Sequence, residues 1–324
     1  MNKKYIVLFN YKWLFKEVLF KRLIDYYKIQ SSYEVVLISK HKLNENVKQY
    51  SSLEELFKHT KGSYLIIEKC VFFESFDELN SLKENTKIYK NNLYIGKFLV
   101  NKKDYFLNHK YIGFLYIIYN DFSAYKLSKI LQNKINKKLI KSGVNILDIN
   151  TTYISVDSTI NKDTTIYPST YIISSKIGNN CSIGPFSTIK NNSIISSDCR
   201  VGNFVEIKNS FIGSNTKIAH HAYIGDSFIG SSVNIGCGVI TCNYDGLNKH
   251  KIVIKDRSFI GSNVNLIAPV NIGSDTYIAS GSTVYNDVAD LDFVIARSYQ
   301  VNKKGYSIKY PYYQKFFSEN LSEE

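Results

Sequence analysis

Residues 177–207 read IGNNCSIGPFSTIKNNSIISSDCRVGNFVEI, and an aliphatic residue returns at every sixth position of this stretch. With a few five-residue steps, the same spacing extends from Ile154 to Ile235, and it resumes from Ile260 to Val284. This period fits neither an amphipathic helix, in which apolar residues recur every ~3.6 residues, nor a half-buried strand, in which apolar residues recur about every second residue. It is typical of a solenoid in which each hexad forms one short strand and one corner. The sequence therefore predicts a mainly β fold, a parallel β-helix of hexapeptide repeats whose aliphatic side chains stack inward.

A β-sandwich with frequent turns is the alternative fold. Its strands would alternate apolar and polar residues, and turns would interrupt them every ~8–12 residues. Here a glycine often follows the aliphatic residue directly, as at Gly184, Gly202 and Gly225, where it would permit a tight corner. The repeat favours the solenoid.

The composition limits the kinds of protein that the chain could be. It has 324 residues, of which 44% are hydrophobic, and no apolar run long enough to span a membrane or to serve as a signal peptide. Its five cysteines lack the paired spacing of a metal site, and Cys237 and Cys242 alone would be poor zinc ligands, so we expect no bound metal and a cytoplasmic location. The net charge of +13 is spread along the chain among acidic residues, which favours anionic small molecules over nucleic acid.

The repeat also predicts the domain organisation. Residues 1–120 lack the hexad, and apolar strands at 4–10, 33–39 and 63–68 alternate with helical patterns, as in a small α/β domain. Residues 121–144 are expected to form a linker helix, and residues 145–298 the solenoid. Residues 299–324 form a charged, aromatic C-terminal tail. The hexad breaks once, at 241–251, and repeat proteins often place such an insertion as a loop on their binding face.

The segments around this break carry a specific resemblance: VGNFVEIKNS, KIAHHAYIGD, VNIGCGVITCNYDGLNKHK, GSNVNLIAPVNIG and VIARSYQ. They resemble the acetyltransferase half of the bacterial bifunctional enzymes that make UDP-N-acetylglucosamine (the GlmU family). The resemblance runs from about residue 183 to 305 and more weakly back to 138. It implies a left-handed β-helix, a homotrimer with active sites between chains, and acetyl-CoA as the co-substrate. The implied reaction is N-acetylation of glucosamine 1-phosphate, which feeds synthesis of the cell-wall precursor.

The resemblance also implies roles for individual residues. His220 matches the general base. The residues that match sugar-phosphate contacts are Lys190, Lys208, Tyr223, Asn234 and Lys249. Those that match acetyl-CoA contacts are Cys237, Asn243, Tyr244, Ser262, Ser280 and Arg297. Three of these depart from the family: Lys190 replaces an arginine and loses its bidentate fork, while Cys237 and Ser280 replace alanine.

The implied reaction is chemically consistent with these residue types. A sugar amine must lose a proton before it attacks a thioester, and an imidazole, with an ordinary pKa of about 6.5, can accept that proton close to neutral pH. Lysines can hold a phosphate dianion, and Arg297 can meet the phosphates of coenzyme A. His221 is the local competitor for the role of base.

Two departures leave alternatives open. Residues 1–120 lack the Gly-rich nucleotide loop of the family's first domain, so we expect a degenerate nucleotidyltransferase-like remnant without uridylyltransferase activity. The chain could also be another hexapeptide sugar acyltransferase, or a catalytically inactive trimeric scaffold. We therefore treat the acetyltransferase function as the leading interpretation of the sequence.

Overall fold

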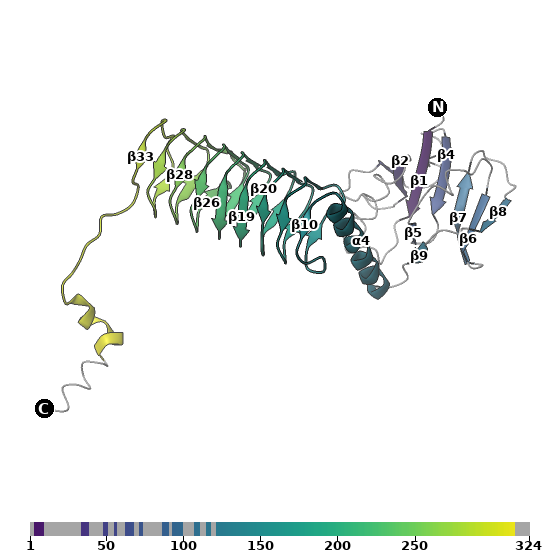
Figure 1. Cartoon of the computed structure of the whole chain (residues 1–324), viewed down its shortest axis with the longest axis horizontal. Coiled ribbons are helices and arrows are strands. Elements are labelled where there is room, and N and C mark those ends of the chain that lie inside the picture. Colours follow the sequence, from purple (N-terminus) through teal and green to yellow (C-terminus); the bar gives the residue numbers. More distant parts are fainter. Residues whose placement is uncertain are drawn as a thin grey trace, which may run out of the picture.

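The computed structural model describes residues 121–314 and, before them, the segments 3–9, 34–38, 48–50, 55–56, 62–67, 71–73, 86–90, 93–99, 107–110 and 115–117. Figure 1 shows the stacked strands of a solenoid that begins beside helix α4, Asp121–Lys141. The predicted fold class, a parallel β-solenoid preceded by a sheet-containing segment and a helix, is confirmed.

The first described segments form a mixed seven-stranded sheet in the order β3-β2-β1-β4-β7-β6-β8. Strands β1, β2, β3 and β4 run parallel, whereas β7 is antiparallel to β4 and β6. The three strands expected from sequence correspond to β1, β2 and β4, and the helical pattern predicted over 13–27 lies outside the described residues. The sheet comprises β1 (Lys3–Phe9), β2 (Glu34–Ile38), β3 (Lys48–Tyr50), β4 (Gly62–Ile67), β6 (Thr86–Lys90), β7 (Leu93–Leu99) and β8 (Leu107–Lys110), and β5 (Val71–Phe73) pairs with β9 (Leu115–Ile117).

Three parallel sheets form the sides of the solenoid, and each coil contributes one strand to each sheet in turn. The first sheet contains β10 (Asn145–Ile146), β13 (Thr165–Ile166), β16 (Ser182–Ile183), β19 (Arg200–Asn203), β22 (Lys217–His220), β25 (Asn234–Ile235), β28 (Phe259–Ile260), β31 (Tyr277–Ile278) and β33 (Phe293–Val294). The second contains β11 (Tyr153–Ile154), β14 (Tyr171–Ile172), β17 (Thr188–Lys190), β20 (Glu206–Lys208), β23 (Tyr223–Gly225), β26 (Ile240–Cys242), β29 (Asn265–Ile267) and β32 (Thr283–Val284). The third contains β12 (Thr159–Ile160), β15 (Lys176–Ile177), β18 (Ile194–Ile195), β21 (Phe211–Ile212), β24 (Ser227–Ile229), β27 (Ile252–Ile254) and β30 (Val270–Ile272).

We name the corners after the sheet that precedes them. The first corner follows the first sheet, as at His220–Ala222, the second follows the second sheet, as at Asp226, and the third follows the third sheet, as at Gly230–Val233. Most corners place a residue in the left-handed region, and Asn, Asp and Ser dominate there because they tolerate positive φ. Gly202 is required for a different reason: a Cβ at this position would overlap the carbonyl oxygen of Ala219 in the next coil.

The aliphatic residues of the hexads form the core. In the central strands, residues such as Ile189, Ile207 and Ile224 are register partners and are fully buried. Each buried side chain of this size contributes about 2–3 kcal/mol. The stack thus provides a rigid support on which exposed side chains recur once per coil, with neighbouring strands about 4.8 Å apart.

Two buried cysteines occupy positions that threonine fills in other coils. Thr164 and Thr216 donate their hydroxyls to the carbonyls of Gly178 and Gly230, each at 2.8 Å. Cys199 makes the corresponding contact with the carbonyl of Gly213, and its sulfur lies 3.1 Å from that oxygen. The thiol therefore acts here as a weak substitute for a hydroxyl.

We expect Cys199→Thr to preserve or raise the stability of the solenoid. Threonine supplies a stronger donor in the same place and can also accept a backbone N–H, as Thr216 does from Val233. Urea unfolding should show a free energy of unfolding within about 1 kcal/mol of the wild type for Cys199→Thr, and a lower one for Cys199→Ala. Equal losses in both variants would contradict this role.

Helix α4 covers the open end of the first coil. Its residues Ile135 and Leu139 pack against the solenoid core. The buried amide of Asn136 donates to the carbonyls of Ile149 and Thr152 at 3.0 and 2.9 Å. The helix therefore supplies hydrogen-bond donors to carbonyls of the first coil, which has no preceding coil to pair with.

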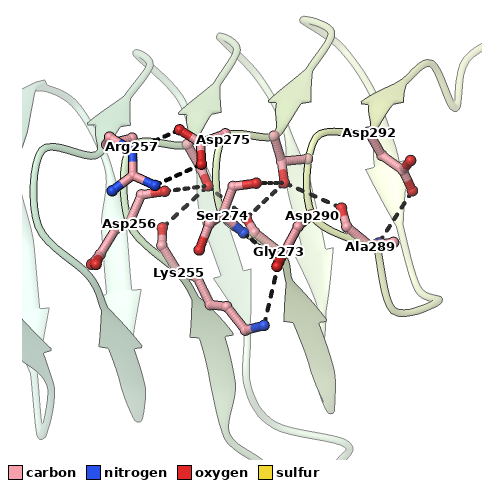
Figure 2. A network of polar contacts seen from close by, with 11 residues as sticks. Lys255, Asp256, Arg257, Gly273, Ser274, Asp275, Ala289, Asp290 and Asp292 are labelled. Carbon is pink, nitrogen blue, oxygen red and sulfur yellow. Dashed lines mark hydrogen bonds and ion pairs between the residues drawn. The ribbon is translucent and has the colours of Figure 1, made fainter.

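A network of polar contacts ties the third corner of the last coils together (Figure 2). Arg257 binds Asp275 through two parallel hydrogen bonds, each 2.7 Å long, and Lys255 lies 3.3 Å from the carboxylate of Asp290. Asp290 also accepts the backbone N–H of Ser274 at 2.8 Å. Beyond this end, residues 295–314 are largely exposed and include the short 3-10 helix η1, Tyr306–Lys309.

Candidate functional site

The three lysines predicted to contact the sugar phosphate gather at the second corner. Lys190 and Lys208 end strands β17 and β20 and are register partners, and the next partner in this column is Gly225. Glycine leaves room here: a Cβ at Gly225 would lie 2.5 Å from the hydroxyl oxygen of Tyr223 and 2.8 Å from the side-chain nitrogen of Asn243. The third lysine, Lys249, comes from the loop at residues 241–251, and its side chain interacts with the amino group of Lys208.

The charges of this lysine cluster (Lys190, Lys208 and Lys249) act on one another. The interaction with the amino group of Lys249 is the main cause that lowers the pKa of Lys208, and desolvation and the charges of Lys249 and Lys190 lower it further. The same interaction raises the pKa of Lys249. Lys190 also pairs with Glu206, with 2.8 Å between Nζ and the carboxylate oxygen. Concentrated positive charge of this kind favours an anionic ligand that brings two negative charges.

The break in the hexads forms a hairpin over residues 243–250. Tyr244 and Lys249 pair as an antiparallel bridge, and the N–H of His250 donates to the carbonyl of Asn243 at 2.8 Å. Asp245 accepts the N–H groups of Leu247 and Asn248 at 2.7 and 2.6 Å, and its other oxygen lies 2.7 Å from Nε2 of His250.

These contacts fix the shape of the hairpin. The backbone hydrogen bond from Asn248, the His250 side chain and the N–H of Leu247 hold the pKa of Asp245 well below its usual value. The hairpin is therefore a defined element that presents the exposed Tyr244 and Lys249.

The predicted base and three predicted acetyl-CoA contacts share a column along the first corner. His220, Cys237, Ser262 and Ser280 each lie two residues after an inward residue of the first sheet, and those inward residues are register partners. All four are exposed. The backbone N–H of Ser262 donates to the hydroxyl of Ser280 at 3.2 Å, and Arg297 donates to the carbonyl of Ser280 at 2.5 Å. The first corner thus carries the base and Arg297, and the second sheet lies between it and the lysine cluster.

His220 points away from the aliphatic core, and its side chain makes no hydrogen bond with the described part of the chain. Its neighbour His221 differs in backbone conformation and in the side chains that it contacts. His221 adopts a left-handed backbone, with φ of 47°, and its ring lies 6.2 Å from that of Phe204. Phe204 in turn stacks on Phe186 at 5.5 Å. His221 is therefore part of an aromatic column, whereas the imidazole of His220 is open to a ligand.

Tyr223 connects the two halves of the candidate site. It projects from β23 on the second sheet, between the first corner at His220 and the second corner at Asp226. In the next coil of the second sheet, Thr241 occupies the inward position that is aliphatic in the other coils. The N–H of Gly225 donates to the Thr241 hydroxyl at 2.7 Å, and that hydroxyl donates to the carbonyl of Tyr223 at 3.1 Å. This buried hydroxyl therefore holds the backbone on both sides of Ile224, directly after Tyr223.

Two predicted site residues are placed differently from the others. Asn234 projects from β25 on the first sheet, in the column of Lys217 and Phe259, and not on the second sheet with Tyr223. Asn243 is buried, and its amide donates to the carboxylate of Asp226. Asn243 is thus turned toward the solenoid, where it anchors the start of the hairpin.

Comparisons with known proteins bear on this arrangement. Residues 175–245 match the family model described as the GMPPB C-terminal domain. The bifunctional protein GlmU of Caldicellulosiruptor saccharolyticus is 42% identical over 213 residues, which are 55% of this chain and 46% of that protein. The C-terminal half of the chain is similar in sequence to the GlmU proteins.

Another GlmU protein, from Shouchella clausii, is 43% identical over 210 residues, 54% of this chain and 46% of that protein. The chain therefore spans less than half the length of these GlmU relatives. Among solved structures, the UDP-N-acetylglucosamine acyltransferase of Francisella novicida has a TM-score of 0.34 and 19% identity, covering 54% of this chain and 77% of that one.

Two kinds of feature do not occur among the described residues. No helix in that part of the chain is long and apolar enough to cross a membrane. Likewise, no three His, Cys, Asp or Glu side chains of residues with a described position gather into a group that could hold a metal ion. Cys237 and Cys242, which flank the same loop in sequence, lie on the first and the second corner respectively.

Several residues that shape the site were not singled out from the sequence. Glu206 pairs with Lys190, Thr241 interrupts the inward ladder, and Asp226 accepts the amide of Asn243. Thr241 could have been found, since it occupies a ladder position where an aliphatic residue is expected. The signal for Asp226 is weaker, because Asn and Asp are common at corners.

Proposed function

We propose that the chain transfers the acetyl group of acetyl-CoA to the amine of glucosamine 1-phosphate, with His220 as the general base. The observation that carries this proposal is the arrangement around the second sheet. An open imidazole stands at one edge, the lysine cluster stands at the other edge, and Tyr223 lies between them. The similarity of this half of the chain to the GlmU proteins supports the same function.

The chemistry assigns one role to each group. The lysine cluster binds the phosphate dianion and so orients the sugar, while the column from Cys237 to Arg297 receives the coenzyme. His220 takes a proton from the amine as its nitrogen attacks the thioester carbonyl carbon. The tetrahedral intermediate then collapses, the carbon–sulfur bond breaks, and the coenzyme A thiolate leaves and takes up a proton. Because a thioester is already activated, the transfer needs no covalent enzyme intermediate.

A homotrimer with sites between chains fits the placement of the residues. Asn234 lies around the first corner from Tyr223, so one chain does not bring all predicted sugar contacts together. The same sheet carries a stack of partly exposed rings, Phe259, Tyr277 and Phe293, with centroids 4.8 and 5.3 Å apart. A second chain that covers this sheet would bury the stack and could contribute the missing contacts.

A panel of acceptors tests the proposal. With acetyl-CoA, we expect the release of free thiol to be fastest with glucosamine 1-phosphate. Glucosamine without phosphate should show a kcat/KM lower by roughly 100-fold or more, because it forgoes the charged contacts with the lysine cluster. Faster transfer to an acceptor that lacks the 1-phosphate would favour another sugar acyltransferase, and no thiol release with any acceptor would favour a scaffold.

A further inference from the structure

Asp226 is a carboxylate at the second corner that the proposed chemistry leaves without a role. It follows β23, adopts a left-handed backbone with φ of 50°, and is half-buried. Its backbone contacts both the lysine cluster and the end of the hairpin. On the side of the lysine cluster, its N–H donates to the carbonyl of Lys208 at 3.0 Å. Its carbonyl accepts the N–H of Ile252 at 3.4 Å, directly after the hairpin returns to the solenoid.

Both carboxylate oxygens of Asp226 are occupied by amide donors. Oδ1 accepts Nδ2 of Asn209 at 2.5 Å, and Oδ2 accepts Nδ2 of Asn243. Asn243 is buried, so this hydrogen bond fixes the point where the hairpin leaves the solenoid. Only a carboxylate can accept from two amides in this way, because an asparagine would turn its own N–H₂ toward one of them.

The charge of Asp226 also acts on the lysine cluster. It raises the pKa of Lys249 and opposes the lowering of the pKa of Lys208. One carboxylate therefore contacts the base of the hairpin and balances the two lysines that the hairpin brings together.

We propose that Asp226 is a positioning residue that holds the hairpin, with Tyr244 and Lys249, at a fixed place against Lys208. This inference rests on the proposed function, because it joins the part of the site assigned to the coenzyme with the part assigned to the phosphate. Asp226 acts through Asn243 and the lysines and touches neither substrate. Its loss should therefore weaken coenzyme A binding more than it weakens phosphate binding.

Asp226→Asn is the informative variant, and Asp198→Asn is its matched control. Asparagine tolerates the left-handed backbone at both positions, so the fold should persist. Asp198 has a φ of 63° and accepts Nδ2 of Asn180 at 2.8 Å, but it lies at a third corner, away from the hairpin. Matching urea midpoints for the two variants would establish that neither unfolds.

Calorimetry with coenzyme A and hydrogen exchange of the hairpin amides provide the readouts. For Asp226→Asn we expect coenzyme A affinity to fall roughly tenfold and the N–H groups of Leu247, Asn248 and His250 to exchange faster. Affinity for glucosamine 1-phosphate should fall less than coenzyme A affinity at neutral pH, because the displacement of Lys249 is offset by the removal of a competing negative charge. Asp198→Asn should match the wild type in all three. Unchanged coenzyme A affinity together with unchanged exchange in Asp226→Asn would overturn the proposal.

The pH dependence adds a readout that a purely structural role would not move. Without the carboxylate the pKa of Lys208 falls further, so its positive charge is lost at a lower pH. Affinity for glucosamine 1-phosphate should therefore begin to decline at a lower pH in Asp226→Asn than in the wild type. If the wild type binds neither ligand, the proposed function fails, yet hydrogen exchange still decides whether Asp226 fixes the hairpin.

Discussion

His220→Ala is expected to reduce kcat for acetyl transfer by about 10²–10⁴-fold, the range associated with losing a positioned general base. The reason is that the sugar amine is partly protonated near neutral pH and must lose a proton as it attacks. The side chain of His220 is exposed at the first corner and makes no hydrogen bond within the described residues, so its removal should not disturb the solenoid. The measurement is release of free coenzyme A from acetyl-CoA with glucosamine 1-phosphate.

His221→Ala is the matched control for this experiment. His221 is adjacent in sequence, but its ring lies beside Phe204, and the variant should retain most of the activity. Both variants should keep the oligomeric state and the unfolding midpoint of the wild type. Full activity in His220→Ala, with a large loss in His221→Ala, would reassign the base to His221. Full activity in both would argue against His220 and His221 as the base.

Ile195→Ala should lower the free energy of unfolding by about 4 kcal/mol, near the upper part of the range for large-to-small substitutions in a core. Ile195 is 1% exposed and lies in the inward ladder of the third sheet, between Ile177 and Ile212. A coil cannot easily collapse around the cavity, because the hydrogen bonds to both neighbouring coils fix the spacing of its backbone.

The adjacent residue provides the control. Ile194 has the same side chain on the same strand, but it points outward and is 41% exposed. Ile194→Ala should change the free energy of unfolding by no more than about 0.5 kcal/mol. Urea unfolding followed by circular dichroism measures both. Similar losses at the two positions would mean that the inward and outward assignment of this strand is incorrect.

The sequence predicted the solenoid well because its signal is repeated in every coil. A single inward isoleucine carries little information, but a run of them at one spacing is compatible with few folds. The hairpin could be located for the same reason, since it is the point where the spacing fails. The column that contains His220, Cys237, Ser262 and Ser280 comes from the structure, because the hairpin interrupts the count between Cys237 and Ser262.

Other features depend on contacts that no spacing reveals. Lys249 lies beside Lys208 because the hairpin folds back over Gly225. The number of residues in the hairpin does not predict the direction in which it folds. Asn243 was predicted as a coenzyme contact, yet in this chain its amide is bound to Asp226. The roles of the site residues remain predictions, and the helical pattern over 13–27 concerns residues outside the described part of the chain.

The helix that covers the first coil has a consequence for self-association. A stack of parallel strands could in principle lengthen by joining end to end with another copy, as open sheet edges allow. Here Asn136 occupies carbonyls at one end, while Asp287 and Asp290 at the other end occupy the N–H groups of Asn271 and Ser274 and add negative charge. Hydrogen-bonding groups at both ends are thus partly occupied, which disfavours end-to-end pairing of one solenoid with another.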